Sequence, residues 1–77
     1  LTVYPNPAAQ HLKIKGVKGR GTGTISLRNG RGMTVLSRIL PPQEEIEMDI
    51  SVLMEGMYLL IASWPGEVET RKILVKR

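Results

Sequence analysis

Apolar and polar residues alternate with a period of two along much of the chain, which is typical of strands with one buried face. The alternation is clearest after His11, where Leu12 and Ile14 face inward and the lysines beside them face outward. Prolines, glycines and asparagines interrupt the pattern at short intervals and mark turns. On this basis we expect strands over residues 1–4, 11–15, 24–28, 33–40, 44–50, 57–62 and 67–77.

The stretch from residue 49 to residue 64 carries the most apolar strand and the reversal before it. We expect Ser51 to cap a single turn over residues 52–55 by accepting a hydrogen bond from a backbone N–H. Gly56 would end that turn with a positive φ, which a residue without a Cβ adopts easily. The apolar run 57–62 then suits a central strand that is covered on both faces.

Two further turn signals set the order of the strands. The Pro-Asn-Pro segment at residues 5–7 stops the first strand and gives it an edge position, because proline removes a backbone donor. Asn29-Gly30 predicts a hairpin with a type I′ turn, which needs positive φ at both central residues.

About seven short strands with frequent turn signals and no helix longer than one turn predict an all-β fold, an immunoglobulin-like antiparallel sandwich. A barrel of the OB type is the alternative, although no segment supplies a helix to plug it. At 77 residues the chain is expected to form one domain, residues 1–77, with a core of Leu, Ile, Val and Met. Because it begins at Leu1 rather than at Met, we expect it to be a piece of a larger protein.

The composition excludes several kinds of site. The chain has no cysteine, which excludes disulfides and thiolate metal ligands, and it has a single histidine, His11. We therefore expect no metal and no cofactor. The longest apolar run is far shorter than the roughly 20 residues that span a bilayer, so we expect no membrane insertion. The first residues lack the charged and apolar regions of a signal peptide.

Candidate catalytic residues are few. Asp49 and Ser51 lie close in sequence, but with His11 as the only imidazole we interpret them as caps of the turn. The glutamates at positions 44, 45 and 47 occur on a predicted strand with apolar residues, and we interpret them as a solvated face rather than as a hydrolytic pair. We therefore expect no enzyme activity.

The net charge of +4 favours an anionic partner. The glycine-rich segment 16–23 matches the GxxG pattern of a phosphate or RNA clamp, but it leads into a strand instead of a helix N-terminus. Six basic residues could still form a patch: Lys13, Lys15, Lys18, Arg20, Arg28 and Arg31. Because no aromatic residue lies between them for base stacking, we expect no nucleic-acid partner.

Large apolar side chains near turns have two interpretations each. Trp64 is either an exposed platform for a sugar or a side chain that covers the edge of a thin core, and we favour the core. The methionines are expected to fill the core, although a methionine-rich surface would suit a partner protein. They are Met33, Met48, Met54 and Met57.

Three blocks of the sequence together resemble a known family. They are Val3-Tyr4-Pro5-Asn6-Pro7-Ala8, then Asp49-Ile50-Ser51 with Leu53 and Gly56-Met57-Tyr58-Leu59-Leu60-Ile61, and finally Lys72-Ile73-Leu74-Val75-Lys76. Their order and spacing are similar to those of the type A C-terminal sorting domain of cargo proteins of the bacterial type IX secretion system, over residues 3–76.

The resemblance implies a non-catalytic secretion signal attached to a cargo domain that precedes it. Such domains dock on the outer-membrane translocon and its shuttle protein. A sortase-like cysteine peptidase then removes them and can join the cargo to surface lipopolysaccharide. The implied route runs through the periplasm to the outer-membrane surface or the extracellular space. Exposed edges at residues 1–4 or in the last strand make a homodimer a further expectation.

Carried over to this chain, the resemblance implies that translocon recognition involves Pro5, Asn6, Pro7, Gly56, Tyr58, Lys72, Val75, Lys76 and Arg77. We expect residues 71–77 to be recognised by strand addition and by acidic pockets on a receptor. Two departures from the family pattern are the additional basic residue Arg77 and the long, basic segment 16–23. The alternative function is that of an accessory immunoglobulin-like module that binds carbohydrate or a surface protein, with Trp64 and the basic loop as its contacts.

Overall fold

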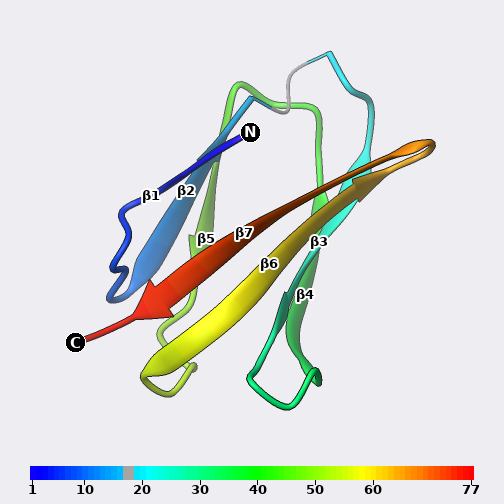
Figure 1. The fold of residues 1–77 in the computed structure, drawn as a ribbon. Helices are drawn as coiled ribbons and strands as arrows, with labels where there is room; N and C mark the ends of the chain where they lie inside the picture. The colour runs from blue at the N-terminus through cyan, green and yellow to red at the C-terminus, as the bar shows by residue number, and fades with distance from the viewer. Residues whose placement is uncertain (17–18) are drawn as a thin grey trace.

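The computed structural model describes residues 1–16 and 19–77, so the predicted glycine-rich loop lies partly outside the described residues. It is an all-β sandwich of two antiparallel sheets, as predicted (Figure 1). The strands are β1 (Thr2–Tyr4), β2 (His11–Lys15), β3 (Gly23–Arg28), β4 (Thr34–Leu40), β5 (Glu45–Asp49), β6 (Gly56–Trp64) and β7 (Glu67–Val75). Among the described residues no helix is long and apolar enough to cross a membrane.

The smaller sheet has the strand order β1-β2-β5 and the larger sheet the order β4-β3-β6-β7. In each strand every second side chain points into the space between the two sheets. Packing of these side chains against those of the other sheet removes their apolar area from water. The side chains with the least exposure form this core: Leu12, Ile14, Ile25, Leu27, Leu40, Ile50, Leu60, Ile73 and Val75. Only Met48 of the four methionines is buried, so the expectation that all four fill the core is wrong for Met33, Met54 and Met57.

Strand β6 lies between β3 and β7, which confirms its central position in the larger sheet. The expectation that both of its faces are covered is wrong. Its odd residues Met57 and Leu59 lie on the outer face and are 54% and 36% exposed, whereas the even residues point into the core. An apolar run identifies a strand, but it does not show whether a second layer covers the far face.

The reversal before β6 is a tight turn without a helical segment, so the expected single turn capped by Ser51 is wrong. Asp49 is the capping side chain, because its Oδ1 accepts a hydrogen bond of 2.8 Å from the Ser51 N–H. The Leu53 N–H then donates to the Ile50 carbonyl across 3.0 Å. Gly56 has φ +150° and begins β6 instead of ending a turn.

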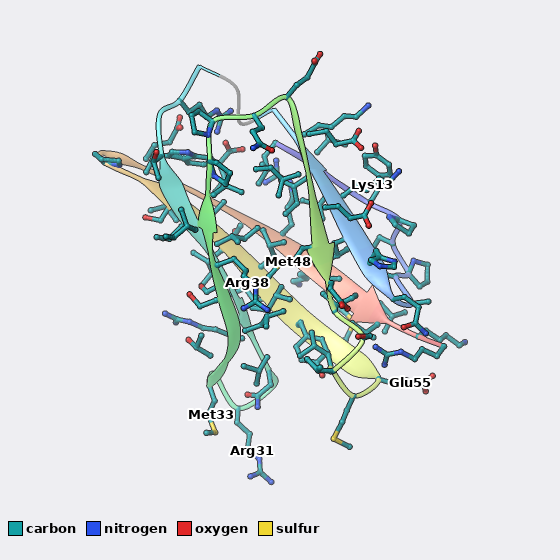
Figure 2. All side chains as sticks on the ribbon, turned by 180° about the vertical axis from the view of Figure 1, so that it is seen from behind. Lys13, Arg31, Met33, Arg38, Met48 and Glu55 are labelled. Carbon is teal, nitrogen blue, oxygen red and sulfur yellow. The ribbon has the colours of Figure 1, made fainter. Side chains whose placement is uncertain are left out.

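The hairpin between β3 and β4 exists as predicted, but its turn is not of type I′. Gly32, with φ +80°, is the one residue of this loop with positive φ, and it donates its N–H to the Asn29 carbonyl across 2.9 Å. The Asn29 side chain also accepts hydrogen bonds from the backbone N–H groups of Arg31 and Met33. The positive φ therefore occurs at Gly32, beyond the Asn-Gly pair, as in a longer hairpin loop that ends with a left-handed residue. Arg31 and Met33 extend from the hairpin tip in Figure 2.

The two lateral sides of the sandwich differ. On one side the segment before β2 reaches β7, where Ala8 forms a parallel bridge to Val75. On the other side β4 and β5 are the outer strands of their sheets, and Figure 2 shows Arg38 and Met48 between them. We call the side with the Ala8 bridge the closed side, and it carries the motif residues. We call the side between β4 and β5 the open side, and it carries a groove.

Candidate recognition site at the C-terminal strand

The three motif blocks meet at one end of the molecule. In the register of β6 and β7, Gly56 lies opposite Val75 and Tyr58 lies opposite Ile73. The Pro-Asn-Pro segment lies beside the end of β7 on its outer edge, close to the C-terminus (Figure 1). The fold therefore brings together all nine residues that the resemblance implies, although they are spread over the whole sequence.

Asn6 joins the first block to the last block through its side chain. Its Nδ2 donates to the Lys72 carbonyl across 3.1 Å, and its Oδ1 accepts from the Leu74 N–H across 3.0 Å. A side-chain amide carries one donor group and one acceptor, as a peptide unit does. Asn6 therefore pairs with the edge of β7 in the way that a neighbouring strand would.

Ala8 continues this pairing along the same edge. Its N–H donates to the Leu74 carbonyl and its carbonyl accepts from the Lys76 N–H, both across 2.8 Å. The backbone groups of residues 72–76 on this edge are thus occupied by residues 6 and 8. In the described state, a receptor strand can add to this part of β7 only if the segment around Asn6 leaves.

Two of the motif residues are buried. Val75 is 1% exposed and belongs to the core. Tyr58 is 9% exposed, and its hydroxyl donates a hydrogen bond of 2.6 Å to the Met54 carbonyl. Buried side chains of this size each stabilise a fold by about 1.5–3 kcal/mol. Their contribution is to the shape of this end, because neither side chain presents a large surface to a partner.

Arg77 ties the end of the chain to the reversal before β6. Its backbone N–H donates to Glu55 Oε2 across 2.6 Å, and its Nη2 donates to the Ile50 carbonyl across 2.8 Å. Its Nη1 donates to the Leu53 carbonyl. The guanidinium therefore satisfies carbonyl groups that the turn leaves without strand partners.

The exposed members of the site are Pro5, Pro7, Lys72 and Lys76, together with partly engaged Asn6 and Arg77. Lys72 lies opposite Leu59 on the outer face of the larger sheet. A shallow depression of about 390 Å³ adjoins it, lined by Asn29, Gly30, Met57, Tyr58, Leu59 and Lys72. An exposed apolar surface with basic residues at its border is typical of a protein-binding surface.

Met57 and Leu59 were missed as surface residues by sequence reasoning, which placed them in the core. One signal was available. A strand that belongs to a two-layer sandwich needs apolar residues on one face only, so an uninterrupted apolar run leaves half of its side chains without a buried position. Such an excess indicates a surface that is covered by something else.

The remaining charged residues do not form a single basic patch. Lys13 and Lys15 lie on β2 and form ion pairs with Glu45, at 3.9 Å and 3.4 Å. Arg20 contacts Glu67 and Glu69 at the far end of β7. Lys18 lies outside the described residues. Lys13, Lys15 and Arg20 are thus paired with acids, and such surface pairs contribute little individually.

The Glu69 carboxylate contacts the guanidinium groups of both Arg20 and Arg71. The hydrogen bond from Arg20 holds the pKa of Glu69 below its ordinary value, with smaller contributions from other nearby positive charges. The same Arg20 guanidinium lies 4.8 Å from the centre of the Trp64 ring. Trp64 is buried, which confirms that it covers the edge of the core and leaves no exposed aromatic platform for a sugar.

Among residues 1–16 and 19–77, no three His, Asp or Glu side chains lie close enough to hold a metal ion. Asp49 and Ser51 are engaged with each other, and the hydrogen bonds from Ser51 lower the pKa of Asp49. Both belong to the turn, as predicted, and Asp49 rather than Ser51 accepts the capping hydrogen bond.

A family model described as "Secretion system C-terminal sorting domain" matches residues 2–76, nearly the whole chain. No curated protein matches the chain. The matched range includes all three blocks and ends one residue before Arg77.

Proposed function

Because this chain belongs to the secretion system C-terminal sorting domains, we propose that the end of the sandwich formed by residues 5–8, 56–59 and 72–77 is the surface recognised during export. The domain is a sorting signal for cargo of the type IX secretion system, and such cargo is exported to the cell surface or the extracellular space. It acts with the type IX machinery and with its attached cargo.

The contacts at this end support a division of roles. Asn6, Tyr58 and Val75 build the site, because they pair with the β7 edge or are buried. Lys72 and Lys76 are exposed and carry the positive charge. We assign recognition to these lysines and to the outer apolar residues Met57 and Leu59, with acidic and apolar groups as their counterparts on the translocon or its shuttle protein.

Recognition through side chains fits this site better than addition of a receptor strand to β7. The observation that carries this choice is the pairing of Asn6 and Ala8 with the backbone of residues 72–76. Strand addition requires unpaired N–H and C=O groups. The finer steps of the proposal are transit through the periplasm, removal by a sortase-like cysteine peptidase and attachment of the cargo to the surface.

A fusion assay tests the proposed function. Residues 1–77 are joined to the C-terminus of a fluorescent protein that is targeted to the periplasm of a host with a type IX system. We expect the reporter to reach the cell surface or the medium, and to remain periplasmic in a strain that lacks the translocon. Retention in both strains, with the domain shown to be folded, would contradict the proposal.

A further inference from the structure

The open lateral side of the sandwich carries a groove between the outer strands β4 and β5. It has a volume of about 310 Å³ and is lined by apolar side chains that include Ile14, Ile25, Ile46 and Met48, together with the charged residues Arg38, Glu47 and Asp49. Figure 2 shows Met48 and Arg38 at this opening. The groove lies on the side of the molecule that β1 and β7 do not cover, and it shares no lining residue with the candidate recognition site.

Among the described residues β2 is the only strand that pairs with β5, so the edge of β5 along this groove has no neighbouring strand. The Ile50 N–H donates to the Gln10 carbonyl across 2.9 Å, which shows which peptide groups of this segment point toward β2. Because these directions alternate along an antiparallel strand, the N–H and C=O groups of Glu45, Glu47 and Asp49 point away from β2. Three residues therefore present backbone donors and acceptors at the edge, in the arrangement that accepts an added strand.

The side chains of β5 specify what such a strand would carry. Glu45, Glu47 and Asp49 are exposed, and Glu47 and Asp49 border the groove that Ile46 and Met48 line. Residues directly opposite each other in adjacent strands place their side chains on the same face, and opposite charges there are favourable. A partner strand needs basic residues opposite the acids and apolar residues opposite Ile46 and Met48.

Strand β2 already pairs with the other edge of β5 in this way. Lys13 lies opposite Glu47 and Lys15 opposite Glu45, while Leu12 and Ile14 face the core. Like charges directly opposite are unfavourable. A second copy that paired its own β5 antiparallel to this one would place acids against acids, so charge argues against that dimer.

We propose that the free edge of β5 binds an extended segment of a partner protein in which basic and apolar residues alternate. The segment adds as a strand beside Glu45–Asp49, with its apolar side chains in the groove and its basic side chains over the acids. This interface is separate from the surface proposed for export, so each can fail without the other.

Titration of the ¹⁵N-labelled domain with a blocked peptide of alternating lysine and valine, about seven residues long, tests this interface. We expect the largest shifts at the amides of Glu45, Glu47 and Asp49. A peptide with glutamate in place of lysine should not bind. Shifts that map to another strand, or equal binding of the acidic peptide, would overturn the proposal.

Two substitutions sharpen the test. Glu47→Lys places a like charge opposite the peptide and should weaken binding about tenfold. Glu67→Lys makes the same charge change in the β6–β7 hairpin and should leave the affinity unchanged. Glu47→Pro removes both the carboxylate and the outward N–H of residue 47, and we expect it to abolish binding, where Glu47→Lys only weakens it, while circular dichroism shows the sandwich retained. Unchanged binding by folded Glu47→Lys and Glu47→Pro would refute strand addition at this edge.

Discussion

The pairing of Asn6 with β7 predicts a measurable loss of stability in Asn6→Ala. The substitution removes two hydrogen bonds, one to the Lys72 carbonyl and one from the Leu74 N–H. Each bond contributes about 0.5–1.5 kcal/mol net, and Asn6 is exposed, so water partly replaces the lost partner. We expect the free energy of unfolding to fall by about 1–2 kcal/mol. For a domain of this size that lowers the melting temperature by roughly 5–15 °C.

Thermal unfolding monitored by circular dichroism measures the loss of stability. Hydrogen exchange at the Leu74 amide tests whether the lost hydrogen bond to Asn6 is its cause. This amide should lose protection in Asn6→Ala. It should keep more protection in Asn6→Asp, because the carboxylate still accepts from Leu74 but no longer donates to Lys72. Gln43→Ala is the matched control, because Gln43 is exposed like Asn6 but its side chain makes no hydrogen bond with the described residues. An unchanged melting temperature with Leu74 still protected would refute the reasoning.

Three further predictions concern the rest of the fold. Gly23→Ala should destabilise the domain by about 2–3 kcal/mol in chemical denaturation, because a Cβ there would lie 2.5 Å from the Ser63 carbonyl oxygen and 2.7 Å from Trp64 Nε1; wild-type stability would contradict this close contact. The Arg20 hydrogen bond lowers the pKa of Glu69 in the folded state, so the stability that Glu69 contributes is present above its unfolded pKa and is lost as pH falls through its folded pKa. Unfolding curves should therefore show a loss of stability below about pH 4.5, and this loss should be shallower in Glu69→Gln. An equally steep loss in that variant would assign the effect to other groups. Arg77→Ala removes the hydrogen bonds to the turn before β6 and should lower the melting temperature by about 5 °C, whereas no change would show that the guanidinium does not stabilise the turn.

The alternation of residues was sufficient to predict most of the strands. In β2 it identified Leu12 and Ile14 as core residues, because a strand has only two faces and one must be apolar. The same reasoning could not place Met57 and Leu59, since a run of apolar residues has no alternation to show which face is buried. The number of layers that cover a sheet is a property of the whole fold.

Local turns were predicted in position but not in geometry. Asn29-Gly30 marked the hairpin correctly, but Gly32 supplies the positive φ that the sequence analysis assigned to the dipeptide. In the turn before β6, the side chains of Asp49 and Ser51 are both able to accept a hydrogen bond from the backbone. The choice of Asp49 depends on the path by which β5 ends, which local sequence does not determine.

The candidate site illustrates the limit of sequence reasoning over long distances. The resemblance indicated Asn6 and Lys72 as members of one site, but it did not show that their contact is a hydrogen bond between a side chain and a strand edge. They are 66 positions apart. Only the antiparallel order of the larger sheet and the path of residues 5–8 bring them together.

The central claim is that the exposed lysines at this end are recognised, whereas the buried and hydrogen-bonded motif residues build the end. Its most direct test is export of the fluorescent fusion carrying Lys72→Gln and Lys76→Gln, compared with Lys13→Gln and Lys15→Gln on β2. Both pairs remove two positive charges; Lys15, Lys72 and Lys76 are exposed, and Lys13 is half-buried. With melting temperatures shown to be equal, we predict that the first pair reduces surface delivery several-fold and that the second pair leaves it at the wild-type level. Equal export of the two variants would contradict recognition by the lysines of β7.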